Sequence, residues 1–395
     1  MSNPPLDDYR WLVSSTAEPF LASATAWSGS LVALTKQLRK NLSADRTHLI
    51  LEQIELRKRA VAKFRAAERM FFTRQLLEQA TDERIAEYKA KRFAAGDRVA
   101  DLCCGIGGDL LTLCHRGPCL AVDRDPVALL LAEVNCQYSG GEVQCEISDV
   151  QDVMETLDVA AWHIDPDRRS SGTRTSRVEF ADPGRETLMC LIKRQDSGAI
   201  KLAPAAELDH ELADEAELEW ISSRRECRQQ VAWLGKLAQQ AGMHTATSID
   251  RRGEATSFTG MPRAGCAIAK PSRYLFDPDP ALVAARLVGA VANAFDLAAV
   301  STGASYLTGE SLVHHSLLTP FEIEEVLPLD TKRLRAMLRD KEIGRLEIKV
   351  RGVQVKPEEL RIQIQSRGDQ KATILVFQSE GSTCVALAHR LTRST

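Results

Sequence analysis

The sequence of 395 residues lacks an apolar run long enough to cross a membrane. Its most apolar stretch, residues 287–300, contains Asn293 and Asp296 and is shorter than the roughly 20 residues that a bilayer-spanning helix needs. The first residues carry acidic side chains where a secretory signal would carry basic ones followed by an apolar run. These absences predict a cytoplasmic protein that makes no use of a membrane.

The sequence also lacks the spacings of a metal site or a disulfide framework. It has ten cysteines but no Cys-x-x-Cys pair, and neither a second cysteine pair nor a suitably spaced histidine accompanies Cys114 and Cys119. The eight histidines are scattered, and a chain of this length can bury a core without disulfides. We therefore expect neither a metal ion nor a disulfide scaffold.

Aromatic residues are few, at 5%, which argues against a broad stacking platform for single-stranded nucleic acid. Basic and acidic residues nearly balance, with 51 Lys and Arg against 54 Asp and Glu, but they are unevenly distributed. Residues 331–395 hold 14 basic and 7 acidic residues, a net of +7, which leaves 37 against 47, a net of −10, for the rest. A basic module on an acidic chain favours contact with an anionic polymer through one face.

The length predicts two or three compact domains. Apolar residues at three- and four-residue spacing predict a helix through Leu49–Ala67, and Thr81 is suited to N-cap another that ends near Phe93. The expected division is an N-terminal helical domain at 1–95, an α/β domain at 96–275, a connecting helical region at 276–325 and a basic α+β domain at 326–395.

From Arg98 onward, short apolar runs alternate with helical stretches. The expected strands are Val99–Cys103, Cys119–Val122, Val143–Ile147, Ala160–Ile164, Ala199–Leu202 and Met243–Ser248. The expected helices are Asp109–Leu113, Pro126–Cys136, Arg185–Arg194, Arg224–Gln240 and Pro280–Leu297. Strands that alternate with helices predict a parallel, doubly wound α/β sheet. In the basic tail we expect a helix near Lys332–Lys341 and strands near Gly344–Arg351, Thr373–Gln378 and Cys384–His389.

The most informative segment runs from Val99 to Asp109, where an expected strand leads directly into Gly105, Gly107 and Gly108 and then into a helix. Glycines at such a turn let the backbone pass close to a ligand because no Cβ intervenes. The spacing is not the Gly-x-Gly-x-x-Gly of nicotinamide-dinucleotide binders. The segment therefore predicts a ligand-binding turn of another kind.

Four acidic residues lie in or directly after four of the expected strands: Asp101, Asp123, Asp149 and Asp165. The carboxyl ends of parallel strands meet at one edge of the sheet, and open α/β sheets bind their ligands there. Asp123 is placed to accept hydrogen bonds from ribose hydroxyls, and Asp149 from an adenine amino group. Any one of these acids could instead be a helix cap.

In these segments the sequence resembles motifs I to IV of class I S-adenosylmethionine-dependent methyltransferases, which have a Rossmann-like fold. The resemblance implies S-adenosyl-L-methionine as the cofactor. It places Asp101, Gly105, Gly107 and Gly108 at the methionine end, Asp123 and Arg124 at the ribose, and Asp149 with Val150 at the adenine.

Two further resemblances concern the rest of the chain. The segment Leu77–Thr81 is similar to one that approaches the cofactor in RNA guanine-N2 methyltransferases of the cap-trimethylguanosine type, which implies cofactor contacts for Gln79 and Thr81; an ordinary turn between helices is the alternative. The whole chain resembles a bacterial group with the Asp101–Asp109 motif, an Asp-Pro-x-Arg-Arg motif at Asp165–Arg169 and a C-terminal THUMP-like module. THUMP modules bind tRNA in other methyltransferases.

The fourth motif bears on the methyl acceptor. Enzymes that methylate amines commonly carry Asn/Asp-Pro-Pro-aromatic there, so that the acid or amide accepts hydrogens from the amine and its nitrogen faces the methyl group. Asp165 and Pro166 keep the first half of that motif, whereas Arg168 replaces the aromatic residue. Because no cysteine lies in a recognisable matching motif of the uracil-C5 enzymes, nitrogen is favoured over carbon as the acceptor.

Arginines follow directly after this motif. Arg168, Arg169 and Arg174 could grip RNA phosphates, unless they form a solvated loop balanced by nearby acids. These features together predict an RNA methyltransferase that acts on a base amine, with guanine N2 favoured, in tRNA or rRNA. The alternatives are a methyltransferase for a small molecule or a protein side chain, and a non-catalytic protein that binds the cofactor or RNA.

Overall fold

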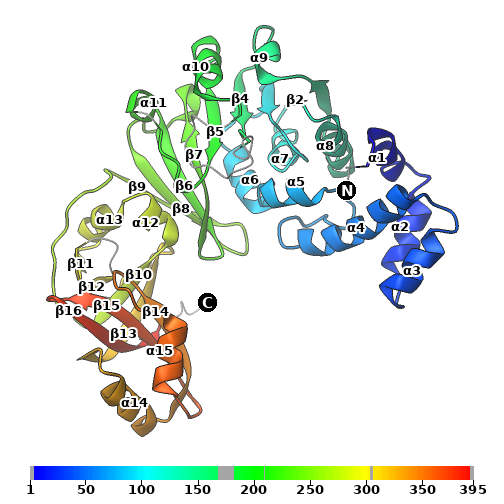
Figure 1. Cartoon of the computed structure of the whole chain (residues 1–395). Coiled ribbons are helices and arrows are strands. Elements are labelled where there is room, and N and C mark those ends of the chain that lie inside the picture. The colour runs from blue at the N-terminus through cyan, green and yellow to red at the C-terminus, as the bar shows by residue number, and fades with distance from the viewer. Residues whose placement is uncertain (1–3, 168–181, 209, 303–305, 392–395) are drawn as a thin grey trace. The chain divides into compact units, whose positions relative to one another are not determined.

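The computed structural model describes residues 4–167, 182–208, 210–302 and 306–391. The chain divides into two compact units (Figure 1). Unit 1 comprises Met1–Ala216 with Val231–Ala241, and unit 2 comprises Glu217–Gln230 with Gly242–Thr395.

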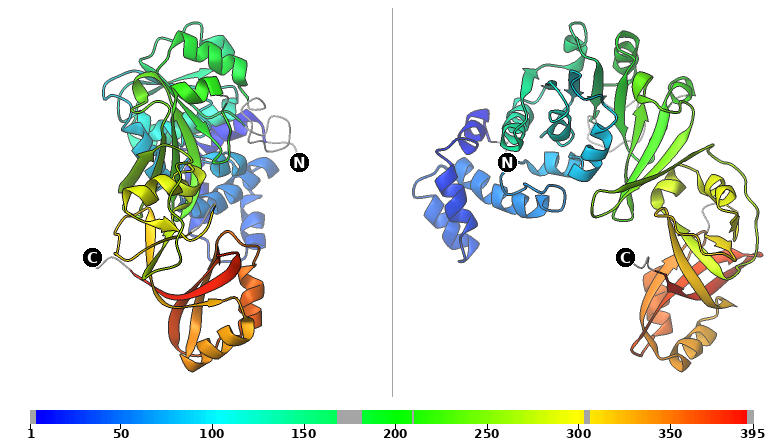
Figure 2. Two further views of the ribbon diagram at one scale, coloured as in Figure 1. Left: turned by 90° about the vertical axis from the view of Figure 1, so that its left-hand side faces the viewer. Right: turned by 180° about the vertical axis from the view of Figure 1, so that it is seen from behind.

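Unit 1 begins with six helices: α1 (Leu6–Leu12), α2 (Glu18–Thr25), α3 (Leu31–Leu38), α4 (Ala44–Ala60), α5 (Arg74–Gln79) and α6 (Glu83–Ala90). These helices, blue in Figure 2, lie together beside the sheet of unit 1. Among them, α1 packs against α8 (Pro126–Ser139), a helix that connects two strands of that sheet. The helix expected over Leu49–Ala67 begins earlier, because Ser43 caps Arg46 N–H, and it ends at Ala60. The expected N-cap at Thr81 was wrong, since Asp82 accepts the N–H of Arg84 and caps α6.

Five strands of unit 1 pair in parallel, as predicted. They are β1 (Val99–Leu102), β2 (Cys119–Asp123), β3 (Val143–Ile147), β4 (Ala161–Ile164) and β5 (Gly198–Leu202), and they lie in the order β3-β2-β1-β4-β5. Besides α8, the connections contain α7 (Leu110–Leu113), α9 (Val150–Val153) and α10 (Arg185–Arg194). The helix α11 (His210–Glu215) follows β5. The order reverses beside β1, which is where doubly wound sheets bind ligands.

The helix expected over Arg224–Gln240 was wrong. This segment contains the strand β7 (Glu226–Trp233) and a 3-10 helix at Gly235–Leu237. Arg224 and Arg225 have φ angles of 54° and 65°, which reverse the chain between β6 (Glu217–Ser223) and β7 in the manner of a two-residue hairpin turn. The segment therefore lies in a sheet rather than in a helix, and residues 229–233 of β7 are buried there.

Unit 2 contains β6, the first part of β7, β8 (His244–Ile249) and β9 (Ala255–Gly260). Its second sheet has the order β11-β12-β10-β13-β16-β15-β14. Those strands are β10 (Tyr274–Pro278), β11 (Ala298–Ala299), β12 (Leu307–Gly309), β13 (Leu318–Pro328), β14 (Ile343–Val350), β15 (Gln370–Ser379) and β16 (Ser382–Arg390). The helices are α12 (Pro280–Ala284), α13 (Val288–Ala294), α14 (Thr331–Asp340) and α15 (Pro357–Ile364).

Alternate residues of the strands β14 to β16 fill two cores of unit 2. Ile348 and Ile374 lie in the core that also contains residues of α14 and α15, whereas Leu375 and Phe377 lie in the core with Leu275 of β10. The helix expected over Pro280–Leu297 is two helices, and Arg286, with a φ of 59°, lies in the break. None of the described helices combines the length and the apolar character that a bilayer crossing demands.

Candidate functional site

The register of the parallel strands brings the predicted acids together. Asp101 on β1 pairs with Ala121 on β2 and with His163 on β4, and His163 pairs with Ala199 on β5. Because side chains alternate along a strand, residues two positions further lie on the same side of the sheet. The next row at the carboxyl edge is therefore Asp123, Cys103, Asp165 and Lys201.

The glycine turn after β1 leaves the backbone exposed beside this row. Cys103, Gly105 and Gly107 have φ angles of 58°, 56° and 85°, so the chain passes through the left-handed region three times in five residues. A Cβ on Gly105 would meet only Leu76, at 3.8 Å. A Cβ on Gly108 would lie 2.9 Å from the backbone nitrogen of Thr81, so the segment before α6 packs directly on the turn.

Asp123 holds the turn in place. Its Oδ2 accepts the N–H of Gly105 at 2.9 Å and its Oδ1 accepts the N–H of Asp125 at 2.9 Å. Burial raises the pKa of Asp123, while these two N–H groups act in the opposite direction. The half-buried carboxylate thus ties the end of β2 to the glycine turn.

Several carboxylates surround Cys103. Burial raises the pKa of its thiol well above the ordinary value, and the negative charges of nearby acids add to this effect. Those acids are Asp123, Asp165, Asp101 and Asp182. A glycine-rich turn beside these carboxylates suits a ligand that carries both a positive charge and hydrogen-bond donors.

A buried polar network lies beneath the turn. Asp101, with 1% of its surface exposed, accepts a hydrogen bond from His163 Nδ1 at 2.7 Å. Lys89 Nζ lies 3.2 Å from His163 Nε2 and 2.6 Å from Asp109 Oδ1. The Thr81 hydroxyl donates to Asp109 Oδ2 at 2.6 Å. We assign the proton to Nδ1 of His163, because that tautomer lets Nδ1 donate to Asp101 while Nε2 accepts from Lys89.

The network contains charged groups removed from water. Burial lowers the pKa of Lys89, although Asp109 opposes that shift. Burial would raise the pKa of Asp109, but Lys89, His163 and Lys201 outweigh it and hold that pKa well below its ordinary value. Asp101 Oδ2 is buried and has no hydrogen-bond partner among the described residues. The sequence assigned Asp101 and Thr81 to the ligand, whereas both lie in this network.

Asp165 and Lys201 form an ion pair at the carboxyl edge. Asp165 follows β4, its backbone N–H donates to Leu102 O, and its side chain is 24% exposed. Lys201 Nζ lies 2.5 Å from Asp165 Oδ2 and 3.1 Å from Gln79 O. Within the described part of the chain, no donor is found on Asp165 Oδ1. The lysine thus fixes the carboxylate and leaves one oxygen for a ligand.

The other predicted residues lie around this centre. Asp149 caps α9 by accepting the N–H of Gln151, and Val150 is buried. Arg124 forms an ion pair with Asp182. Gln79 Nε2 donates to Asp167 Oδ1 at 3.3 Å, while Pro166 is buried. The predicted Arg168, Arg169 and Arg174 lie outside the described residues.

Three residues of the network were not predicted from the sequence, namely Lys89, His163 and Asp109. The pairing of Lys201 with Asp165 was not predicted either. The sequence offers a weak signal for two of them, since Asp109 closes the glycine motif and His163 precedes Asp165 by two positions. Nothing in the local sequence of α6 marks Lys89 as buried. Among the described residues, no group of three or more His, Cys, Asp or Glu side chains could hold a metal ion.

Comparisons with known proteins place this site in context. A family model described as THUMP domain-like matches residues 318–390. The chain is 31% identical over 341 residues to an uncharacterised S-adenosylmethionine-dependent methyltransferase of Mycobacterium tuberculosis, found in two strains, and the match covers 84% of this chain and 93% of the relative. A crystal structure of a candidate methyltransferase from Porphyromonas gingivalis W83 matches with a TM-score of 0.76, covers 98% of both chains and is 19% identical, which shows a shared fold.

Proposed function

This chain belongs to the S-adenosylmethionine-dependent methyltransferases, and from that premise we propose that it methylates RNA on an exocyclic amine of a base, with guanine N2 favoured, in tRNA or rRNA. The observation that carries the choice of a nitrogen acceptor is the Asp165 carboxylate, which Lys201 holds through Oδ2 while no described residue donates to Oδ1. The choice of RNA rests on the basic C-terminal module.

The residues of the glycine turn fit S-adenosyl-L-methionine, a sulfonium cation with an ammonium group and two ribose hydroxyls. The four carboxylates around Cys103 match its positive charge, and the turn presents bare backbone at Gly105. We assign Asp123 and Arg124 to the ribose, Asp149 and Val150 to the adenine, and Gly105, Gly107 and Gly108 to the methionine end, near the unpartnered Oδ2 of Asp101. When bound, the cofactor supplies an electrophilic methyl group.

Asp165 would orient the acceptor. Its free Oδ1 accepts one hydrogen of the amine, and the carbonyl of Asp165 or Pro166 accepts the other, so that the nitrogen lone pair points toward the methyl group. After transfer the nitrogen loses one proton, and Oδ1 is the nearest acceptor for it. Lys201 keeps the carboxylate in this orientation through its contact with Oδ2.

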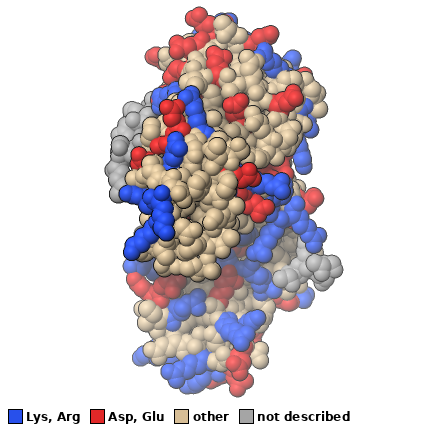
Figure 3. Space-filling model, turned by 90° about the vertical axis from the view of Figure 1, so that its right-hand side faces the viewer, with Lys and Arg blue, Asp and Glu red and all other residues tan. Residues whose placement is uncertain are grey.

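The RNA substrate is supported by the match of residues 318–390 to the THUMP-like family and by the net charge of +7 over residues 331–395. Phosphate contacts from several Lys and Arg side chains provide most of the affinity for a nucleic acid and make it dependent on salt. On the face shown in Figure 3, basic side chains gather in small groups with acidic ones between them. Such a surface suits a structured RNA that is held at separate points of its backbone.

The test uses RNA from cells that lack this gene, labelled cofactor and mass spectrometry of the nucleosides. The wild-type chain should transfer label to one nucleoside, and Asp165→Ala should reduce turnover at least about a hundredfold while its affinity for the cofactor stays within about twofold of the wild type. Asp152→Ala removes an exposed carboxylate of α9 and serves as the control.

Three results would contradict the proposal at different points. If no label enters the tRNA or the rRNA fraction, RNA is excluded as the substrate. Label that enters RNA at the wild-type rate with Asp165→Ala excludes the role of the carboxylate. A slope of binding affinity against salt that stays near zero would also show that the RNA backbone is not contacted.

A further inference from the structure

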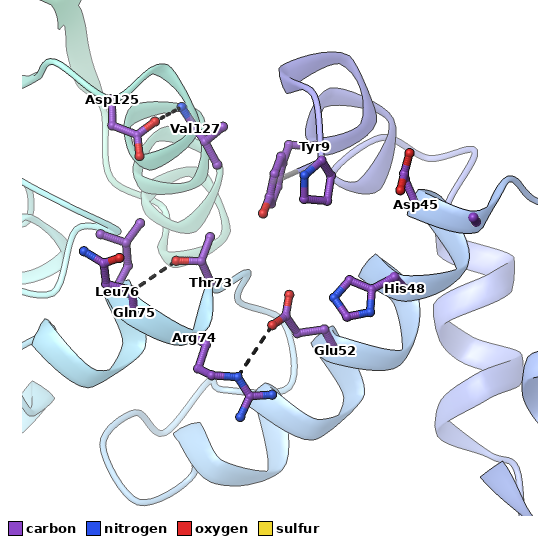
Figure 4. A pocket seen from close by; sticks show the side chains of 12 residues that line it. Tyr9, Asp45, His48, Glu52, Thr73, Arg74, Gln75, Leu76, Asp125 and Val127 are labelled. Carbon is purple, nitrogen blue, oxygen red and sulfur yellow. Dashed lines mark hydrogen bonds and ion pairs between the residues drawn. The ribbon is translucent and has the colours of Figure 1, made fainter. Parts of the chain in front are cut away.

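A second cavity of unit 1 lies outside the methyl-transfer site. It has a volume of about 520 Å³ and lies between the N-terminal helices and the start of α8 (Figure 4). Its lining residues are Pro4, Tyr9, Ala44, Asp45, His48, Glu52, Thr73, Arg74, Gln75, Leu76, Asp125 and Val127. Asp165 does not belong to this lining, and neither do the residues that we assign to the cofactor.

The lining has an excess of negative charge. Asp45, Glu52 and Asp125 carry three carboxylates, and Arg74 is the one lysine or arginine among the lining residues. The guanidinium of Arg74 is already engaged, because both of its terminal nitrogens lie 3.2 Å from the carboxylate of Glu55, which is not part of the lining. The cavity therefore repels phosphate and attracts a cation.

Two polar side chains of the lining have no hydrogen-bond partner among the described residues, although Glu52 forms an ion pair with Arg74. Tyr9 is 5% exposed, its hydroxyl points into the cavity (Figure 4), and no hydrogen bond to it is found in the described ranges. Glu52, whose side chain is 16% exposed, lies 3.8 Å from Arg74 Nε, which is too long for a hydrogen bond. Polar groups of buried side chains are nearly always paired in folded proteins, so the hydroxyl of Tyr9 is suited to meet a ligand in the cavity.

The spacing of the acids indicates what kind of cation fits. Asp45 and Glu52 are seven residues apart on α4, two turns of the helix, which separates them by about 10 Å along its axis. Asp125, which caps α8, stands on the opposite wall. A linear aliphatic amine with several ammonium groups spans a comparable length. Each ammonium has only hydrogen-bond donors, which match the carboxylate acceptors of the lining. The buried ring of Tyr9 presents its hydroxyl rather than its face, so a stacked base is not favoured.

We propose that this cavity is a binding site for a linear aliphatic polyamine, whose ammonium groups are held by Asp45, Glu52 and Asp125 with the hydroxyl of Tyr9 as a further acceptor. Burial, with the negative charges of Glu52 and Asp125, raises the pKa of Tyr9 to about 12, so the phenol stays neutral at physiological pH. The site does not depend on the RNA substrate, since none of its residues contributes to methyl transfer. Leu76 lines the cavity and also faces Gly105, so an occupant would adjoin the glycine turn.

Calorimetry of the full chain with spermidine at about 0.15 M salt, where weak surface attraction is screened, tests this site. Glu52→Gln removes one charge from the lining and should weaken binding about tenfold, or 1.4 kcal/mol. Glu18→Gln is the control, because it removes one charge from an exposed acid of α2 that lies outside the lining. It should change the affinity less than about twofold. Tyr9→Phe, which removes only the hydroxyl, should weaken binding by a smaller factor.

Three outcomes would overturn the proposal. Spermidine that does not bind the wild-type chain at millimolar concentration excludes the ligand class. Equal losses with Glu52→Gln and Glu18→Gln would reduce the effect to nonspecific attraction by the acidic surface of the N-terminal helices. Unchanged affinity with both Glu52→Gln and Tyr9→Phe, at unchanged melting temperature, would place the polyamine elsewhere on the molecule.

Discussion

The buried lysine beneath the glycine turn provides the sharpest test of the packing. Lys89 is 2% exposed, and its ammonium lies 2.6 Å from Asp109 Oδ1 and 3.2 Å from His163 Nε2. In Lys89→Met the side chain keeps its length but loses its charge, so Asp109 keeps Thr81 as a donor and loses its cationic partner. Removing one partner of a buried ion pair costs about 3–5 kcal/mol, because the other charge is left in an apolar surrounding.

The assay is thermal unfolding followed by circular dichroism with and without the cofactor. The transition that the cofactor shifts upward is that of unit 1, because a ligand stabilises the unit that binds it. For a domain of this size, a loss of about 3–5 kcal/mol lowers the melting temperature by about 6–20 °C. The double variant Lys89→Met, Asp109→Asn removes both charges and should recover at least half of that loss.

Two results would refute this reasoning. If Lys89→Met lowers the melting temperature of unit 1 by less than about 2 °C, the ammonium contributes no net stabilisation to the folded state. If the double variant is no more stable than the single one, the loss comes from packing rather than from an unpaired carboxylate. Either outcome would remove the network as a support of the turn.

Two further predictions concern single positions. Asp277 is buried, and its pKa is lowered by Arg351, Lys349 and Arg225, against the effect of burial; its charged form therefore stabilises unit 2 above the unfolded pKa of about 3.9 and loses that effect as the pH falls further. Asp277→Asn should lower stability at pH 7 and flatten its dependence on pH below about 4, as acid unfolding curves of both proteins would reveal. Gly108→Ala places a Cβ 2.9 Å from the backbone of Thr81, so the turn must shift, and we expect at least about a tenfold loss of cofactor affinity by calorimetry, or 1.4 kcal/mol, with the fold intact.

The parallel sheet could be predicted because its signals are local. Each expected strand between Val99 and Leu202 begins and ends within one residue of the observed one, since apolar runs bounded by Gly, Pro and Asp leave little freedom. The helix prediction for Arg224–Gln240 was wrong for the opposite reason. Its apolar residues fit a helical period and a strand equally well, and the hairpin turn at Arg224 and Arg225 uses residues that rarely adopt a positive φ.

The partners of the acids could not be predicted, because they depend on register and on packing between distant segments. Asp101 resembles a ligand-binding acid in sequence, yet its neighbour across the β1–β4 pair is His163, and the two side chains bond to each other. Lys89 reaches the same place from α6, and a charged residue on a short helix is far more often exposed. A sequence signal for a buried lysine would require knowledge of the tertiary contact itself.

Two neighbouring rows of side chains on the sheet couple the buried network electrostatically to the edge that carries Asp165. His163 and Asp165 lie two residues apart at the end of β4, so they occupy consecutive positions on one side of the sheet. The charge of Lys201, which holds Asp165, lowers the pKa of Asp109 and that of Lys89 in the row below. Positive and negative side chains alternate from the buried row to the edge. A change of charge at Lys89 therefore changes the electrostatic potential at Asp165, the carboxylate that we propose orients the acceptor. Lys89 therefore connects the stability of unit 1 to the electrostatics of its edge.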